Sequence, residues 1–443
     1  MAILTEAEAK RIIDKVLSFS KADDLSVSLS GGRRGNIRYA RNAVSTSGES
    51  ENISLGVTAS FGKKSGTATI NELDDASLEK TVRRAEEVAR LAPENPEYMP
   101  LLGPQTYLKT DPYAKSTANM DPDYRARATF DSVDPCRKKN LTAAGYMEDS
   151  TRFNAIGNTK GLSAYNRETS VEFSVTVRTA DGTGSGYATR DVTDVSKLNT
   201  REATEIAMQK AMASTNARAL EPGKYTVILE PAALVANVDA SLLNAMVRSM
   251  DARSADEGRS FLSKKGGGTR LGEKLFDERV TIYSDPTNLD VPNGAFSGDG
   301  RPQEKVTWIE KGVVKNMPYS RYWAEKKGVH ATPGGGNFIM EGGTQSLADM
   351  IKNTEKGILV TRFWYIRPVD PQTLLYTGLT RDGTFYIENG QIKFPVKNFR
   401  FNESPVIMLN NLEALGKPVR MGGNLVPPMK IRDFTFTSLS DAV

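Results

Sequence analysis

Histidine and cysteine are the scarcest residues of this 443-residue chain, which has one of each, His330 and Cys136. A single cysteine excludes an intrachain disulfide, and this fits a reducing compartment. Hydrolytic zinc sites use three protein ligands, drawn mainly from histidine, with Asp, Glu or Cys completing the set. One histidine and one cysteine cannot supply a histidine-rich ligand set. Any Ser-His-Asp or Cys-His site would have to use His330.

Long apolar runs and concentrated charge are also missing. No run approaches the roughly 20 apolar residues that span a bilayer. Residues 1–6 lead straight into a charged helical pattern, so we expect no signal peptide and a cytoplasmic location. The net charge of +4 is small and the lysines and arginines are scattered. This distribution predicts neither a membrane surface nor nucleic acid as a partner.

The length and composition predict a globular protein with more than one core. The chain is 39% hydrophobic and 25% charged, and 443 residues are too many for a single core. We predict an α+β fold, with N-terminal α/β units that contain antiparallel strands, followed by a mostly antiparallel β C-terminal domain. The N-terminal domain would span residues 1–221, as two subunits joined by a proline-rich connector at about 93–122. The C-terminal domain would span residues 222–443.

Local signals define the elements of the N-terminal half. Thr5 and Glu8 form a capping box that begins a helix. Asp74 begins a second helix, which ends before Pro93. Alternating or periodic apolar residues predict strands at residues 25–29, 53–61 and 171–177, and a helix at about 200–217.

The C-terminal half contains many short strands with turn signals. A strand is expected at residues 224–230, followed by one helix from Ala232 to Met250. Asn389-Gly390 suits the two positive-φ positions of a type I′ hairpin turn. Further elements are a hairpin turn at residues 310–312, a helix at 347–354 and a final strand at 431–436.

Two glycine-rich segments, Gly31–Gly35 and Asp181–Gly186, are predicted to be turns between strands. A phosphate-binding loop would need a strand before it and a helix N-terminus after it. The residues after both segments have a strand pattern instead, which favours turns. An aspartic-protease dyad would need Asp-Thr-Gly twice, and the sequence does not contain it.

The C-terminal half carries an ordered series of short motifs. They are Glu221-Pro222-Gly223, Glu257–Phe261, Leu271–Phe276, Val280–Pro286, Asp299-Gly300, Ile309–Val313, Lys356–Thr361, Tyr386–Ile392, Pro395-Val396 and Gly422-Gly423-Asn424. Ser54–Val57 and Ala85–Ala89 extend the series into the first half. This order resembles the TldD/PmbA family, the modulators of DNA gyrase.

The resemblance implies a cytoplasmic protein that acts on peptides. Family members work as proteases in toxin–antitoxin turnover and in the maturation of ribosomal peptides. TldD-like members bind zinc through an HExxxH helix and a downstream cysteine, whereas PmbA-like (TldE) members lack these ligands and pair with a TldD-like partner.

This sequence departs from the zinc-binding pattern at both places. The segment after the 224–230 strand, Ala233–Asn244, has no histidine, and the downstream stretch Asn410–Pro418 has no cysteine. The resemblance therefore implies the PmbA-like branch, with no metal ligand, no cofactor and no catalytic residue to assign. Asp239 and Asp251 are either polar residues of a former groove or part of a solvated face, and Cys136 is expected to be structural.

A peptide-binding groove is predicted around the one histidine. His330 is either a catalytic base or substrate contact, or a loop histidine near the groove, and Gly334, Gly335, Gly336 and Asn337 follow it. Glycines let backbones approach closely, and an antiparallel domain can bind a peptide as an added strand.

The expected function is that of a metal-free family member. It would bind peptide or unfolded polypeptide, or complete a dimer with itself or with a TldD-like zinc protease, and it would be inactive alone. Two alternatives remain. One is a hydrolase with an unusual site, in which carboxylates alone hold a metal or His330 is the base. The other is a DNA-gyrase-associated regulator.

Overall fold

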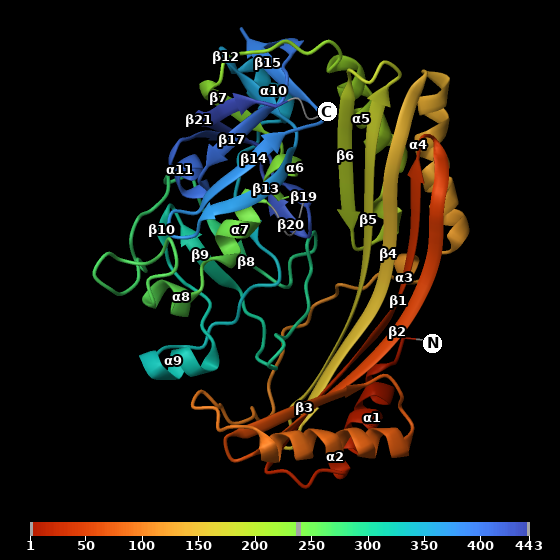
Figure 1. The fold of residues 1–443 in the computed structure, drawn as a ribbon, viewed down its shortest axis with the longest axis vertical. Coiled ribbons are helices and arrows are strands. Elements are labelled where there is room, and N and C mark those ends of the chain that lie inside the picture. Colours follow the sequence, from red (N-terminus) through yellow and green to blue (C-terminus); the bar gives the residue numbers. More distant parts are fainter. Residues whose placement is uncertain (1–2, 236–240, 441–443) are drawn as a thin grey trace.

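The computed structural model describes residues 3–235 and 241–440 (Figure 1). The fold is mixed α+β, as predicted. One six-stranded antiparallel sheet forms the N-terminal lobe (residues 3–221), and sheets of six and nine strands form the C-terminal lobe (residues 222–440). None of the described helices is both long and apolar enough to cross a membrane.

The N-terminal sheet has long, regular strands in the order β3-β2-β1-β4-β5-β6. Every neighbouring pair is antiparallel. The strands are β1 (Asp24–Ala40), β2 (Ala43–Phe61), β3 (Lys64–Ile70), β4 (Leu141–Asn158), β5 (Ser163–Thr179) and β6 (Ser185–Val192). The predicted turn at residues 181–186 does separate β5 from β6.

Helices cover one face of this sheet in two groups, each with its own core. α1 (Glu6–Ser18) and α2 (Asp75–Leu91) pack on one end of the sheet. α4 (Pro122–Lys138) and α5 (Thr200–Ala213) pack on the other end. Two short elements, α3 (Lys115–Ala118) and the 3₁₀ turn η1 (Val195–Lys197), come directly before α4 and α5 in sequence. The capping box of Thr5 and Glu8 and the Asp74 cap are confirmed.

The predicted turn at Gly31–Gly35 is wrong, because these residues lie inside the continuous strand β1. The glycines instead allow close packing. A Cβ at Gly35 would lie 2.1 Å from the guanidinium of Arg125. Arg125 is buried beneath the sheet, where it pairs with Asp149 at 2.7 Å and with Glu49 on β2. Glycine in a strand can mark such a close approach as well as a turn.

The C-terminal lobe is built from short strands in two sheets. The smaller sheet, in the order β10-β9-β8-β11-β20-β19, contains β8 (Ile282–Ser284), β9 (Val306–Glu310), β10 (Val313–Val314), β11 (Ile339–Met340), β19 (Val419–Met421) and β20 (Asn424–Val426). The larger has the order β13-β14-β17-β21-β7-β12-β15-β16, and β18 pairs with β21. Its strands are β7 (Gly223–Leu229), β12 (Lys356–Val360), β13 (Phe363–Asp370), β14 (Leu375–Thr380), β15 (Thr384–Glu388), β16 (Gln391–Pro395), β17 (Phe399–Glu403), β18 (Leu412–Leu415) and β21 (Met429–Leu439).

Short helices pack around these two sheets. They are α6 (Pro231–Val235), α7 (Leu242–Arg248), α8 (Ala252–Asp256), α9 (Arg321–Lys327), α10 (Leu347–Lys352) and α11 (Pro405–Asn410). The single helix expected from Ala232 to Met250 is wrong, because Ser241 is extended (φ −129°, ψ 145°) and begins α7 as a separate helix. The Asn389-Gly390 turn is confirmed, with φ of 51° and 72° between β15 and β16.

Candidate functional site

The two lobes are joined by a carboxylate on β6. Asp191 accepts hydrogen bonds from the backbone N–H groups of Gly422 (2.7 Å) and Gly423 (2.9 Å), and from Nε of Arg420 (2.9 Å). Gly422 and Gly423 form the turn between β19 and β20, where their φ values of 58° and 72° favour glycine. Asp191 therefore holds a C-terminal turn against the edge of the N-terminal sheet.

The same turn lies against α6, at the start of the segment where the resemblance implies a metal-binding helix. A Cβ at Gly422 would lie 2.9 Å from the carbonyl oxygen of Val235, the last residue of α6. α6 also contacts β13, β19 and β20. We call the region between β6 on one side and α6, β13 and the β19–β20 turn on the other the interlobe cleft.

The interlobe cleft opens into a hollow of about 560 Å³. Its lining comes from both lobes: Asp111, Tyr113, Ala114, Val192, Thr193, Asp194 and Lys197 on one side, and Leu289, Asp290, Pro292, Pro418, Val419, Arg420 and Leu425 on the other. Both charge signs are present, and Leu289 (88% exposed) and Val419 (43%) add apolar surface. Mixed charge with exposed apolar side chains suits a peptide better than a uniformly charged ligand.

Two arginines and two aromatic rings stack where β13 meets β6. The guanidinium of Arg362 lies 3.6 Å from the ring centroid of Tyr187 on β6 and 4.7 Å from that of Trp364 on β13. Arg381 lies 5.2 Å from the Trp364 ring. We call these four residues the arginine–aromatic stack. Trp364 and the adjacent Tyr365 are 36% and 56% exposed, so the stack presents aromatic surface to solvent.

A buried aspartate balances part of this charge. Asp382 pairs with Arg362 at 2.6 Å and accepts a hydrogen bond from Ser185 Oγ of the N-terminal lobe. Burial, with the nearby cations Arg362 and Arg178, lowers the pKa of Arg381. Asp382 has a φ of 54°, a conformation that Asp tolerates better than most residues.

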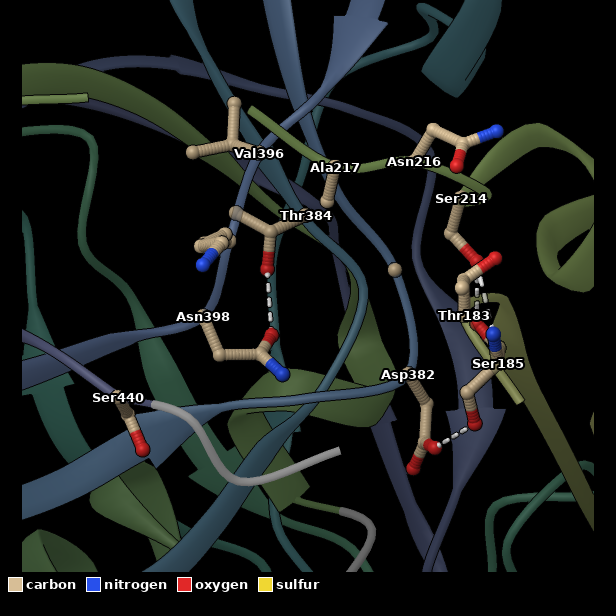
Figure 2. A pocket seen from close by; sticks show the side chains of 12 residues that line it. Thr183, Ser185, Ser214, Asn216, Ala217, Asp382, Thr384, Val396, Asn398 and Ser440 are labelled. Carbon is tan, nitrogen blue, oxygen red and sulfur yellow. Dashed lines mark hydrogen bonds between the residues drawn. The ribbon is translucent and has the colours of Figure 1, made fainter. Parts of the chain in front are cut away.

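Figure 2 shows a second, smaller hollow beside Asp382, with a volume of about 250 Å³. Its lining includes the hydroxyl or amide side chains of Thr183, Ser185, Ser214, Asn216, Thr384, Asn398 and Ser440, together with Ala217 and Val396. The hydrogen bond from Ser185 to Asp382 and the bond from Thr384 to Asn398 fix two sides of it (Figure 2).

The predicted groove residues lie in the segment between α9 and β11 of the C-terminal lobe. His330 is exposed and its Nε2 lies 2.8 Å from Oε1 of Glu304. Gly334, Gly335 and Gly336 follow it on the surface. None of these four is among the residues that line either hollow.

Asn337 has a different environment from its neighbours. It is buried, donates to the carbonyls of Asp285 (2.8 Å) and Val291 (2.6 Å), and accepts from the N–H of Asp285 (3.1 Å). It thereby fixes the 285–291 loop, which carries Leu289 and Asp290 into the hollow.

The zinc-ligand residue types do not come together. Cys136 lies on α4 and faces the buried core, where burial raises the pKa of its thiol to about 11. His330 lies on the surface of the other lobe. Within residues 3–235 and 241–440, no three His, Cys, Asp or Glu side chains are grouped so as to hold a metal. The described residues therefore do not fit the zinc ion that the resemblance implies.

Two aspartates near the family's metal helix were singled out from the sequence. Asp239 lies outside the described residues. Asp251 caps α8, where its Oδ1 accepts from the N–H of Ser254 at 2.8 Å. Asp251 thus has a local structural role.

Sequence reasoning missed the residues that join the lobes, Asp191 and Arg420, and the Arg362–Asp382 pair. Asp191 and Arg420 are 229 residues apart in sequence and Arg362 and Asp382 are 20 apart, and no spacing rule connects either pair. A weak signal did exist in Asp382-Gly383, a dipeptide that is typical of a turn with positive φ.

Known proteins resemble this chain along its whole length. Residues 222–438 match the PmbA/TldA metallopeptidase C-terminal domain, residues 25–89 match domain 1 and residues 116–215 match the central domain. The metalloprotease PmbA of Escherichia coli O157:H7 is 23% identical over 97% of this chain and 98% of its own.

Solved structures share the fold. TldE from Thermococcus kodakarensis superimposes with a TM-score of 0.86 at 19% identity, over 97% of this chain and 99% of its own. A Thermotoga maritima protein described as a candidate modulator of a DNA gyrase also gives 0.86, at 17% identity over 97% and 100%.

Proposed function

Since this chain belongs to the TldD/PmbA metallopeptidase family, we propose that it is a metal-free member that holds peptide in the interlobe cleft and completes a dimer with a TldD-like zinc protease. One observation carries the proposal. The single histidine and the single cysteine lie in different lobes, one on the surface and one in a core, so they cannot jointly ligate a metal in the cleft.

The cleft offers several features that suit an extended polypeptide. The hollow of about 560 Å³ has carboxylates, a lysine and an arginine beside exposed Leu289 and Val419. Trp364 and Tyr365 on β13, the strand that borders the interlobe cleft, have exposed rings, and aromatic side chains bury large areas at low entropic cost. The partner chain would supply the zinc ion that activates water.

Elemental analysis of the purified chain tests the metal-free part. We expect substoichiometric zinc and no peptide cleavage by the chain alone. Cleavage should appear only when a TldD-like chain with an intact HExxxH helix is added, and should vanish when its histidines are replaced. One tightly held zinc ion per chain would contradict the proposal.

A second candidate, a hydrolase that uses His330 as base, draws support from the His330–Glu304 pair, since a carboxylate commonly orients a catalytic imidazole. The variant His330→Ala decides between them. Loss of a measurable activity of the chain alone would favour the hydrolase, whereas unchanged behaviour in every assay would favour the metal-free subunit.

A further inference from the structure

The face of the N-terminal sheet that α1, α2, α4 and α5 leave open carries a polar hollow at mid-strand. Side chains alternate along a strand, so Leu25, Val27 and Leu29 of β1 point to the helices and the even-numbered residues of β1 point to the open face. The hollow has a volume of about 400 Å³ and is bordered by residues 30–34 of β1, 50–54 of β2 and 152–154 of β4. We call it the sheet hollow. In Figure 1 the open face is turned toward the C-terminal lobe.

Strand pairing fixes which side chains meet in the sheet hollow. Gly32 of β1 lies opposite Asn52 of β2 and opposite Arg152 of β4, and directly paired residues share a face of the sheet. A Cβ at Gly32 would lie 2.6 Å from the carbonyl oxygen of Thr151 and 3.1 Å from Cγ of Arg152. Glycine at this position therefore leaves room for the stem of Arg152 in the hollow.

The sheet hollow is positively charged, and the described residues that line it include no carboxylate. Arg34 pairs with Glu148. Arg33 donates to a main-chain carbonyl on the helix-covered face of the sheet. Arg152 is exposed and forms no ion pair or hydrogen bond within the described residues, although Glu168 lies opposite it on β5. The guanidinium of Arg152 is therefore available to a ligand.

The neutral side chains of the sheet hollow also lack partners. Five hydroxyl or amide side chains in its lining make no hydrogen bond within the described part of the chain: Ser30, Ser50, Asn52, Ser54 and Asn154. In the hollow of the interlobe cleft, by contrast, Asp194 accepts from Ser196 and Arg420 donates to Asp191. The polar groups of the sheet hollow thus do not stabilise the fold through side-chain hydrogen bonds, and they can serve a ligand.

The charges around the sheet hollow favour a single carboxylate as that ligand. The planar guanidinium of arginine binds a carboxylate through two parallel N–H···O bonds. Glu148 on β4 and Glu168 and Glu172 on β5 share the open face with the two arginines. These three carboxylates would repel a polyanion such as nucleic acid, whereas one carboxylate fits between them.

The sheet hollow and the interlobe cleft lie on one face, within reach of one peptide. Arg152 pairs with Glu168, Asp191 pairs with Glu172, and both glutamates are on β5. Two strand spacings and the four residues from 168 to 172 separate Arg152 from Asp191, which is about 16 Å. An extended peptide covers this distance with about five residues.

We infer that the sheet hollow binds a carboxylate of the peptide that occupies the interlobe cleft, with Arg152 as its main ligand and Arg34 beside it. The carboxylate is either the C-terminus of the peptide or an acidic side chain. The inference rests on the proposed function and deepens it, since it selects acidic or C-terminal peptide segments at a second contact outside the cleft.

Three N-terminally labelled, unstructured peptides of about ten residues test the inference by fluorescence anisotropy. The first has a free C-terminal carboxylate and no Asp or Glu, the second is the same peptide amidated, and the third is amidated with one internal Glu. The wild-type chain should bind the first or the third about tenfold more tightly than the second. The peptide that is preferred identifies the source of the carboxylate.

Variants of Arg152 test whether the sheet hollow causes the preference. Arg152→Gln should abolish it and leave the affinity for the neutral amidated peptide unchanged, because glutamine stays polar but lacks the charge. Arg152→Lys should restore only part of it, since an ammonium group lacks the planar fork. Arg127→Gln is the matched control, exposed on α4 at the helix-covered face, and should keep the full preference. Equal urea midpoints would show that all four chains are folded.

The outcomes separate this inference from the proposed function. Equal binding of the three peptides by the wild type, or a preference that Arg152→Gln keeps, would overturn the inference and leave the proposed function standing. Failure of every peptide to bind would overturn both. Binding of single-stranded DNA that Arg152→Gln abolishes, with no preference among the peptides, would overturn the inference in favour of a polyanion.

Discussion

The two edges β13 and β2 lie on different sides of the molecule and differ in what they present. β13, at the interlobe cleft, interrupts its backbone ladder with bulges and Pro368 but exposes Trp364 and Tyr365. β2 keeps an uninterrupted backbone over residues 46–54 but carries small and polar side chains. The first edge is therefore suited to recognition by side chains, and the second to pairing through main-chain hydrogen bonds.

Each edge also has a buried ion pair behind it. Arg125 holds Asp149 and Glu49 behind β2, and Asp382 holds Arg362 behind β13. Removing one member of a buried pair leaves an uncompensated charge, and this costs more than the pair itself contributes. These pairs therefore allow each edge to be perturbed separately.

The largest effect is expected for Arg125→Met. Arg125 is 1% exposed, and its loss leaves the carboxylate of Asp149, which is 3% exposed, without this ion-pair partner. We expect the free energy of unfolding to fall by about 3–5 kcal/mol, measured by urea denaturation. Arg127 lies exposed on the same helix, over the ring of Tyr124, and forms no ion pair within the described residues, so Arg127→Met is the control and should change stability by less than about 0.5 kcal/mol. Equal losses in both variants would contradict a special role for the buried pair.

A smaller loss is expected at the other edge for Asp382→Asn. The amide keeps the shape of the side chain and tolerates the positive φ of this position, but it removes the charge that faces Arg362. We expect a loss of about 1–3 kcal/mol in the free energy of unfolding, with weaker peptide binding. Unaltered peptide affinity together with lower stability would show that the stack is structural only.

Peptide affinity should depend on Trp364 by about one order of magnitude. Truncation of an exposed interface aromatic typically costs on the order of 1–2 kcal/mol of binding, which is about tenfold in the dissociation constant. Fluorescence anisotropy with a labelled unstructured peptide would measure Trp364→Ala against Phe130→Ala. Phe130 is 61% exposed on α4, in the other lobe, and its loss should not change the affinity. Equal weakening by both would place the peptide elsewhere.

The sequence predicted elements that local signals define and missed those that depend on distant contacts. Thr5, Asp74 and Asn389-Gly390 act through neighbours within a few residues, and all three are confirmed. Gly31–Gly35 looked like a turn because the partners of the glycines, Arg125 and Phe153, are about 90 residues or more away in sequence. The break at Ser241 is likewise a tertiary effect that apolar periodicity does not reveal.

The site was less predictable than the fold for the same reason. Composition alone limits the possible metal sites, because the numbers of histidines and cysteines are known without knowing where they lie. The cleft, in contrast, is assembled by Asp191 with residues 229 or more positions away, and by Ser185 with Asp382. His330 was a candidate because it is the single histidine. Its exposed position beside Glu304 depends on tertiary packing, which local sequence signals do not reveal.

The smallest effect concerns the buried thiol of Cys136. Burial raises the pKa of this thiol from about 9 to about 11, so the folded state keeps a proton that the unfolded chain releases. Stability linked to Cys136 is therefore fully present below about pH 9 and is lost as the pH rises toward 11. Cys136→Ala should flatten this part of the stability–pH curve, measured by urea denaturation at pH 8 and pH 10.

The native thiol should also resist iodoacetamide at pH 8 until the protein is unfolded, because the thiolate is the reactive form and the side chain is inaccessible. Rapid labelling of the native chain would contradict the buried position of the Cys136 side chain.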